Sequence, residues 1–147
     1  MSFGLNITLF SILIIFSSCA KIEDQKQLVQ TVNGKDSFSD YTVNETYDFI
    51  VNNKSNLNFV LLDVRTKDEY DTAHLEGSRL IDFYQPNFKQ QLGTLNKNRT
   101  YIVYCRTGNR SGQTVDIMKE IGFREAHNVS GGMVEWKSQN LSLDFSK

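Results

Sequence analysis

The segment TYIVYCRTGNRSG, Thr100 to Gly112, decides the fold class of this chain because it joins a buried strand to a helix through a short polar loop. Thr100 to Cys105 is an apolar run too short for a helix, so we expect a strand buried on both faces of a sheet. Apolar residues from Ser111 to Ile121 recur at helical spacing and predict a helix, with Gly122 just past its end.

Further strands and helices alternate on both sides of this segment. A second buried-strand pattern lies at 58–64, and the pairs Thr42 with Glu45 and Thr66 with Glu69 have the spacing of capping boxes that begin helices. The other expected elements are strands at 79–83 and 126–129 and helices at 86–92, ending at Gly93, and at 132–139. Such short alternating units predict an α/β domain with a mainly parallel central sheet and helices on both faces.

The composition fits one domain. With 147 residues, 39% of them hydrophobic and 12% aromatic, the chain can close a single core, which we expect to span residues 41–147. Acidic and basic residues are interspersed and the formal net charge is -1, so we expect no nucleic-acid partner. We expect the domain to be a monomer.

The first 19 residues have the pattern of an export signal. Leu5 to Phe16 is almost wholly apolar and, at about a dozen residues, is shorter than the ~20 that span a bilayer. The segment resembles a bacterial lipoprotein signal, which implies a lipid anchor at Cys19, a tether at 20–40 and a place in the bacterial cell envelope, facing the periplasm or the surface. A secretory signal cleaved nearby and an uncleaved anchor are the alternatives.

The loop after Cys105 suits a reactive thiol. A strand ending at Cys105 and a helix opening at Ser111 would point the backbone N–H groups of residues 106–111 into one concavity. Gly108 and Asn109 tolerate the unusual dihedral angles that such a loop needs. Because amides and a helix N-terminus both stabilise an anion, we expect a lowered pKa for Cys105. A buried structural cysteine, which is the alternative, would not need this loop.

Three motifs, in this order, resemble the rhodanese family over residues 42–138. They are LLDVRTKDEYDTAHLEGS, YCRTGNRS and GFREAHNVSGGMVEW. The resemblance implies a rhodanese-like domain and a sulfurtransferase in which Cys105 takes the outer sulfur of a small anionic donor such as thiosulfate. Cys105 would hold this sulfur as a persulfide and pass it to a thiol or a cyanide-like acceptor. This chemistry requires no metal or organic cofactor.

The resemblance also implies roles for the residues around the thiol. The persulfide and the donor would be held by the loop of Arg106, Thr107, Gly108, Asn109, Arg110 and Ser111. Asp63 and Arg65 would rim the site or brace the loop, and the alternative is a structural ion pair with Arg110 or the backbone. Structural roles are expected for His74, His127 and Trp136.

Other functions remain open from the sequence. A related phosphatase would have five residues between its cysteine and its phosphate-binding arginine, whereas four separate Cys105 from Arg110. Arsenate reduction is a further possibility for an oxyanion loop. A non-catalytic envelope-tethered module, which binds a protein or carries sulfur, is the main alternative. A redox role would lack a resolving cysteine, because the chain has only Cys19 and Cys105.

Overall fold

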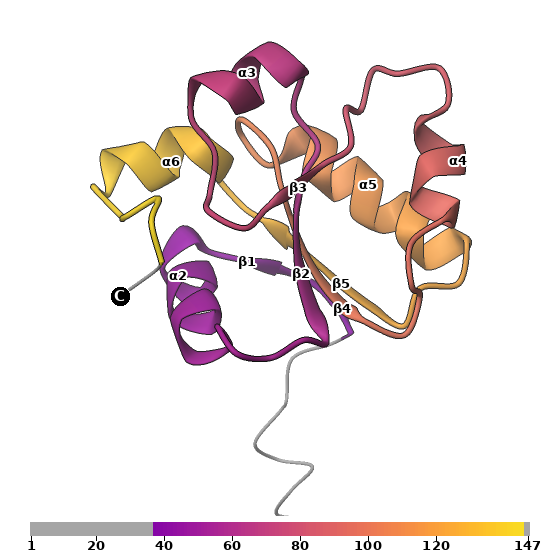
Figure 1. Ribbon diagram of the computed structural model, residues 1–147, viewed down its shortest axis with the longest axis horizontal. Helices are drawn as coiled ribbons and strands as arrows, with labels where there is room; N and C mark the ends of the chain where they lie inside the picture. Colours follow the sequence, from indigo (N-terminus) through magenta and orange to yellow (C-terminus); the bar gives the residue numbers. More distant parts are fainter. Residues whose placement is uncertain (1–36, 146–147) are drawn as a thin grey trace, which may run out of the picture. The chain divides into compact units, whose positions relative to one another are not determined.

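A computed structural model describes residues 37–145 of the chain (Figure 1). Strands and helices alternate along this part of the sequence. In chain order they are β1 (Phe38–Tyr41), α2 (Val43–Asn52), β2 (Phe59–Asp63), α3 (Lys67–Thr72), β3 (Arg79–Leu80), α4 (Phe88–Gly93), β4 (Thr100–Tyr104), α5 (Asn109–Glu120), β5 (Glu125–Val129) and α6 (Gly132–Ser138).

The strands form one sheet in the order β1-β5-β4-β2-β3, and every strand pair in the described residues is parallel. The α/β fold with a parallel central sheet, expected from the sequence, is therefore confirmed. β4 lies between β2 and β5, with Val103 in register with Leu62 on one side and Asn128 on the other. The carboxyl end of β4 thus lies at the centre of one edge of the sheet, where ligands bind in open parallel sheets.

Helices cover both faces of the sheet (Figure 1). Successive side chains of β4 point to opposite faces, so Tyr101 and Val103 join the core beneath α4 and α5. Ile102 and Tyr104 join a second core with α2 and α6. Burial on both faces explains why β4 reads as a continuous apolar run.

Both capping boxes are present. Thr42 caps α2 and Thr66 caps α3, and each threonine side chain accepts a hydrogen bond from the backbone N–H three residues on. The side chains of Glu45 and Glu69 accept in return from the N–H of their capping threonines. These pairs satisfy helix N–H groups that have no partner within the helix.

The structure departs from the expected boundaries at several places. Residues 38–40 were expected in the tether, yet they belong to β1, an edge strand whose polar residues hid it from the apolar pattern. Gly93 is the last residue of α4 and has no positive φ, so it does not form the expected left-handed end of that helix. Gly122, which follows α5, does have the left-handed conformation, with φ 87°. The strand expected at 79–83 is shortened to two residues.

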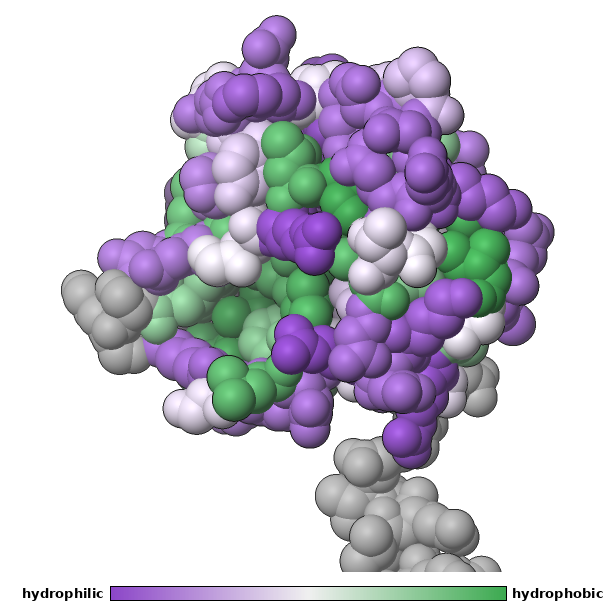
Figure 2. All heavy atoms as spheres, turned by 45° about the vertical axis from the view of Figure 1, so that its right-hand side comes forward, coloured by the Kyte–Doolittle hydropathy of each residue, from purple (hydrophilic) through white to green (hydrophobic). Residues whose placement is uncertain are grey.

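The surface is mostly hydrophilic on the face in Figure 2, where apolar side chains gather in a hollow. An open groove of about 640 Å³ is lined by residues from the end of α2 to β2, together with Glu76, Gly77, Arg99 and Phe145. Within residues 37–145, no helix is both long and apolar enough to cross a membrane. The expected signal at 1–19, the lipid site at Cys19 and residues 20–36 of the expected tether lie outside the described residues.

Candidate active site

Cys105 follows β4 directly, and a tight turn carries the chain into α5. Gly108 caps this helix with φ 95°, a left-handed conformation that favours glycine. A Cβ on Gly108 would lie 3.2 Å from both the backbone nitrogen of Gly131 and the carbonyl oxygen of Val129. Asn109 was expected to share the unusual dihedral angles, but it is already the first residue of α5, so the loop is shorter than expected.

The sulfur of Cys105 is surrounded by hydrogen-bond donors. The backbone N–H of Gly108 donates to Sγ at 3.2 Å and the hydroxyl of Ser111 approaches it at 3.3 Å. Burial, which leaves the residue 1% exposed, would raise the pKa of Cys105. Hydrogen bonds from Ser111, Thr107 and Gly108 outweigh burial and lower this pKa overall. The thiolate is therefore favoured at this position.

Ser111 begins a chain of polar groups that leads away from the sulfur, through the buried Asn128 to the exposed Asp40. Its Oγ lies 2.6 Å from Oδ1 of Asn128 on β5. The amide nitrogen of Asn128 donates to Asp40 of β1 at 2.7 Å, which turns Oδ1 toward Ser111. Two neighbouring strands thus fix the serine that contacts the thiol, a role for Asn128 that sequence reasoning missed.

The start of α6 holds the carbonyl groups of the loop. The N–H of Met133 donates to the carbonyl of Cys105 and that of Val134 to the carbonyl of Arg106, each at 3.0 Å. The carbonyl of Arg106 and the N–H of Thr107 belong to one trans peptide group, in which C=O and N–H point in opposite directions. Because Val134 binds that carbonyl, the N–H of Thr107 is turned toward the sulfur. A Cβ on Gly132 would lie only 2.5 Å from the carbonyl oxygen of Cys105, which explains the glycine.

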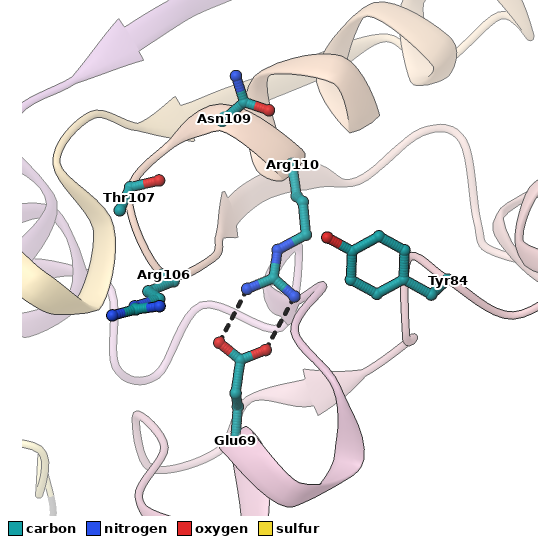
Figure 3. A pocket seen from close by; sticks show the side chains of 6 residues that line it. All are labelled: Glu69, Tyr84, Arg106, Thr107, Asn109 and Arg110. Carbon is teal, nitrogen blue, oxygen red and sulfur yellow. Dashed lines mark hydrogen bonds and ion pairs between the residues drawn. The ribbon is translucent and has the colours of Figure 1, made fainter.

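Arg110 is bound by a carboxylate that sequence reasoning did not place in the site. Its two terminal nitrogens donate to the two carboxylate oxygens of Glu69, each at 2.8 Å. The guanidinium also lies 5.4 Å from the ring centre of Tyr84. Figure 3 shows Arg110 reaching from α5 to Glu69 on α3, with Tyr84 beside it. The pair depends on the strand order of the folded sheet, because α3 follows β2 and β2 is the neighbour of β4.

These groups line an open pocket of about 420 Å³ over the loop. Its walls are formed by Glu69, Tyr84, Arg106, Thr107, Asn109 and Arg110 (Figure 3). Within the described part of the chain, the side chain of Arg106 has no hydrogen-bond or ion-pair partner, and this residue is exposed. Cys105 is not on the wall.

Asp63 and Arg65 form a buried ion pair with each other. Nε of Arg65 donates to the Asp63 carboxylate at 2.9 Å, and its terminal nitrogen donates to the carbonyl of Ala73. No hydrogen bond joins either side chain to the loop within residues 37–145. Arg110, suggested as a partner, binds Glu69 instead. Arg65 does lie near the site, since it lines a second pocket that shares Arg106 and Glu69 with the first.

The remaining singled-out residues are structural. His74 stacks on Tyr70 with ring centres 3.8 Å apart, and His127 is buried between Ser39 and Glu125. The indole of Trp136 donates to the carbonyl of Ser142 and packs in the core of α2 and α6. No group of three or more possible metal ligands occurs among the His, Cys, Asp and Glu side chains of residues 37–145.

Comparisons with known proteins agree with this geometry. Residues 45–139 match the family model described as "Rhodanese-like domain". The chain is 38% identical over 79 residues to "Probable adenylyltransferase/sulfurtransferase MoeZ" of Mycobacterium tuberculosis, covering 54% of this chain but only 20% of that protein. It is 33% identical over 72 residues to "Thiosulfate sulfurtransferase PspE" of Escherichia coli, covering 48% of this chain and 67% of that protein. A crystal structure of a rhodanese-like domain protein from Staphylococcus aureus is similar, with a TM-score of 0.54 and 30% identity over 67% of this chain and 89% of that chain.

Proposed function

This chain belongs to the rhodanese-like domain family, and on that premise we propose that it is a sulfurtransferase with Cys105 as its nucleophile. The observation that carries the proposal is the set of donors around one sulfur, from Gly108, Thr107 and Ser111. The donors stabilise an anion on Sγ, both as the thiolate and as the persulfide that follows it. Two relatives with sulfurtransferase in their names support the same reaction class.

The first half-reaction moves a sulfur atom to the enzyme. The thiolate of Cys105 attacks the outer sulfur of a donor such as thiosulfate, and a new S–S bond forms as the donor's own S–S bond breaks. The electron pair of the broken bond leaves with sulfite, so the charges balance without a proton transfer. Arg106, which is exposed on the pocket wall, attracts the anionic donor and stabilises the departing sulfite.

The second half-reaction returns the enzyme to its first state. A thiolate or cyanide acceptor attacks the terminal sulfur of the persulfide, the S–S bond to Cys105 breaks, and its electron pair restores the thiolate. The loop amides hold negative charge in both states of the enzyme, so neither half-reaction needs a general base. The side chains of Thr107 and Asn109 lie on the pocket wall, where an acceptor would approach.

The ion pair between Arg110 and Glu69 argues against phosphate-ester hydrolysis. A phosphatase of related fold uses the loop arginine to hold phosphate, but both terminal nitrogens of Arg110 bind Glu69. The loop is also one residue short for that chemistry, with four residues between Cys105 and Arg110. Sulfur transfer therefore accounts for the site better than phosphate transfer does.

Mass spectrometry of the intact protein tests the proposal. Thiosulfate or another sulfane-sulfur donor should add the mass of one sulfur atom, and cyanide should remove it as thiocyanate. Cys105→Ser should prevent the gain while leaving the fold intact. Should the mass stay constant with every donor, the chain would be a binding module and not a sulfurtransferase. If sulfur is gained but no acceptor turns over, the chain is a sulfur carrier.

We also propose that the protein works in the bacterial cell envelope, anchored by lipid at Cys19. The proposal rests on the apolar segment from Leu5 to Phe16 and the cysteine that follows it. Cys19→Ser should move the protein from the membrane fraction to the soluble fraction. Retention of the variant on membranes would show that lipid at Cys19 is not the anchor.

A further inference from the structure

Strands β1, β2, β4 and β5 begin at one edge of the sheet, which we call the amino edge. Phe59 of β2 is in register with Thr100 of β4, and Thr100 with Glu125 of β5. Phe38 of β1 pairs with the next residue of β5. Cys105 follows the other end of β4, five residues or about 17 Å away. The amino edge and the active-site loop therefore lie at opposite ends of the strands (Figure 1).

The loops that reach the amino edge carry positive charge. Segments 53–58, 94–99 and 121–124 lead into β2, β4 and β5, and they contain four cations and no Asp or Glu. The cations, all of them exposed, are Lys54, Lys97, Arg99 and Arg124. Cations gathered on one surface attract anionic partners.

Among the described residues, three acids adjoin these loops in the sequence or across the groove. Glu120, at the end of α5, is matched by Lys89, with 3.8 Å between the charged atoms. Glu125 accepts from the hydroxyl of Thr100, and Glu76, on the groove, accepts from the N–H of Phe145. The four cations of the loops thus outnumber the two remaining acids, although the formal net charge of the whole chain is -1. Positive charge is therefore concentrated at the amino edge.

Leu57 lies in the first of these loops and is 84% exposed. It lines the groove of about 640 Å³ together with Lys54 and Arg99. A single exposed leucine needs no explanation by itself. An exposed leucine grouped with cations is the combination by which peripheral proteins enter the headgroup region of an anionic bilayer.

The chain also enters the domain at the amino edge. Ser37 is the first residue that the structure describes, and its carbonyl accepts from the N–H of Ala126, the second residue of β5. The expected lipid anchor at Cys19 is therefore joined through the chain to the edge that carries the cations and Leu57. An acidic protein or a nucleic acid would account for the charge but not for this placement.

We propose that the amino edge binds the anionic phospholipid headgroups of a bilayer and holds the Cys105 loop facing away from the membrane. The inference rests on the proposed location in the cell envelope and goes beyond sulfur transfer. The four cations bind headgroup phosphates, while Leu57 enters the interfacial layer. Because the anchor keeps the domain at the bilayer, a weak attraction is enough to set its orientation. Donors and acceptors then reach Cys105 from the aqueous side.

Tryptophan fluorescence of the full chain in vesicles tests this orientation. Leu57→Trp places a tryptophan at the amino edge, and Tyr84→Trp places one on the active-site pocket, where Tyr84 is 67% exposed. The single native tryptophan, Trp136, is 1% exposed and gives a constant background, which is measured in the unaltered protein. The vesicles contain brominated phosphatidylcholine as the quencher, with or without phosphatidylglycerol as the anionic lipid.

With phosphatidylglycerol present, quenching of the tryptophan in Leu57→Trp should exceed quenching in Tyr84→Trp by about threefold or more. In phosphatidylcholine alone the difference should disappear. It should also disappear at about 1 M salt, where the Debye length falls to about 3 Å. Equal quenching in the two variants, or a difference that does not depend on phosphatidylglycerol, would overturn the proposal.

Removal of charge from the amino edge gives a second test. Arg99→Gln combined with Arg124→Gln, in the Leu57→Trp protein, removes two of the four charges and should lower the quenching about twofold or more. Lys67→Gln combined with Lys137→Gln is the matched control, because it removes two charges from exposed side chains of α3 and α6, which follow the carboxyl ends of β2 and β5. The control should leave the quenching unchanged, and an equal loss in both pairs would contradict a specific surface.

Sedimentation of the same vesicles separates the proposals from one another. If the full chain sediments with neither kind of vesicle, the lipid anchor and the membrane-binding edge both fail. The gain of sulfur at Cys105 is measured by mass spectrometry and does not depend on this result, so the proposed function is judged separately.

Discussion

The hydroxyl of Ser111 lies 3.3 Å from Sγ of Cys105, while the same oxygen lies 2.6 Å from Oδ1 of Asn128. A hydroxyl has one hydrogen to donate. When Cys105 is a thiolate, donation to sulfur is favoured because a hydrogen bond to an ion is the stronger one. When Cys105 is a neutral thiol, the hydroxyl can donate to Asn128. The serine can thus follow the charge on the sulfur without moving its oxygen.

Ser111→Ala should raise the pKa of Cys105, because it removes one donor that stabilises the thiolate while burial, which opposes ionisation, remains. At pH 7 less thiolate is then present, so alkylation by iodoacetamide should slow by about tenfold, as expected for the loss of a hydrogen bond to a charged group. The measurement is the alkylation rate between pH 5 and 9. Ser138→Ala, on the exposed face of α6, should leave the profile unchanged. An unshifted profile for Ser111→Ala would mean that backbone amides alone set this pKa.

Gly132→Ala should destabilise the domain and disable the loop. The new Cβ would lie 2.5 Å from the carbonyl oxygen of Cys105, at a position where φ is already 53°. We expect a loss of about 3 kcal/mol or more in the free energy of unfolding, measured by urea denaturation. Gly77→Ala is the matched control, since Gly77 has φ 75° but nothing within 4 Å of the added atom, so only about 1 kcal/mol should be lost. Similar losses in the two variants would show that the loop can move aside.

Glu69 should make the stability of the domain depend on acid. Its pKa falls from an ordinary 4.5 to about 2 in the folded protein, so its contribution to stability is complete above about pH 4.5 and is lost as the pH falls toward 2. The free energy of unfolding should fall in both proteins between pH 6 and pH 3. The fall should be smaller in Glu69→Gln, by on the order of 1 kcal/mol after allowance for solvent screening. Urea denaturation at the two pH values measures this. Equal losses in both proteins would contradict a contribution from Glu69.

The elements with strong local signals were predicted from the sequence. Both buried strands, β2 and β4, and both capping boxes depend on residues close together in the chain, so their patterns are visible without the fold. β1 was missed because an edge strand pairs on one side only and needs no continuous apolar run. The thiol and its loop were found because they too form one contiguous segment.

The partners of the loop were harder to predict. Glu69 is 41 residues from Arg110 in the chain, and sequence reasoning had already assigned it to a helix cap. The same carboxylate caps α3 and binds Arg110, and only the cap is visible in the local sequence pattern. Tyr84 follows a two-residue strand and carries no motif. Contacts of this kind depend on which strands are neighbours, which a single sequence leaves open.

The start of α6 binds two carbonyl groups of the loop, so the segment from Cys105 to Ser111 depends on residues outside it for its conformation. Met133 and Val134 never face the sulfur, yet their amides orient the peptide groups that do. A fragment that stopped before Gly132 would retain every residue from Cys105 to Ser111 but lose the two amides that bind the carbonyl groups of Cys105 and Arg106. Searches or designs that transplant this heptapeptide should therefore carry the closing helix with it.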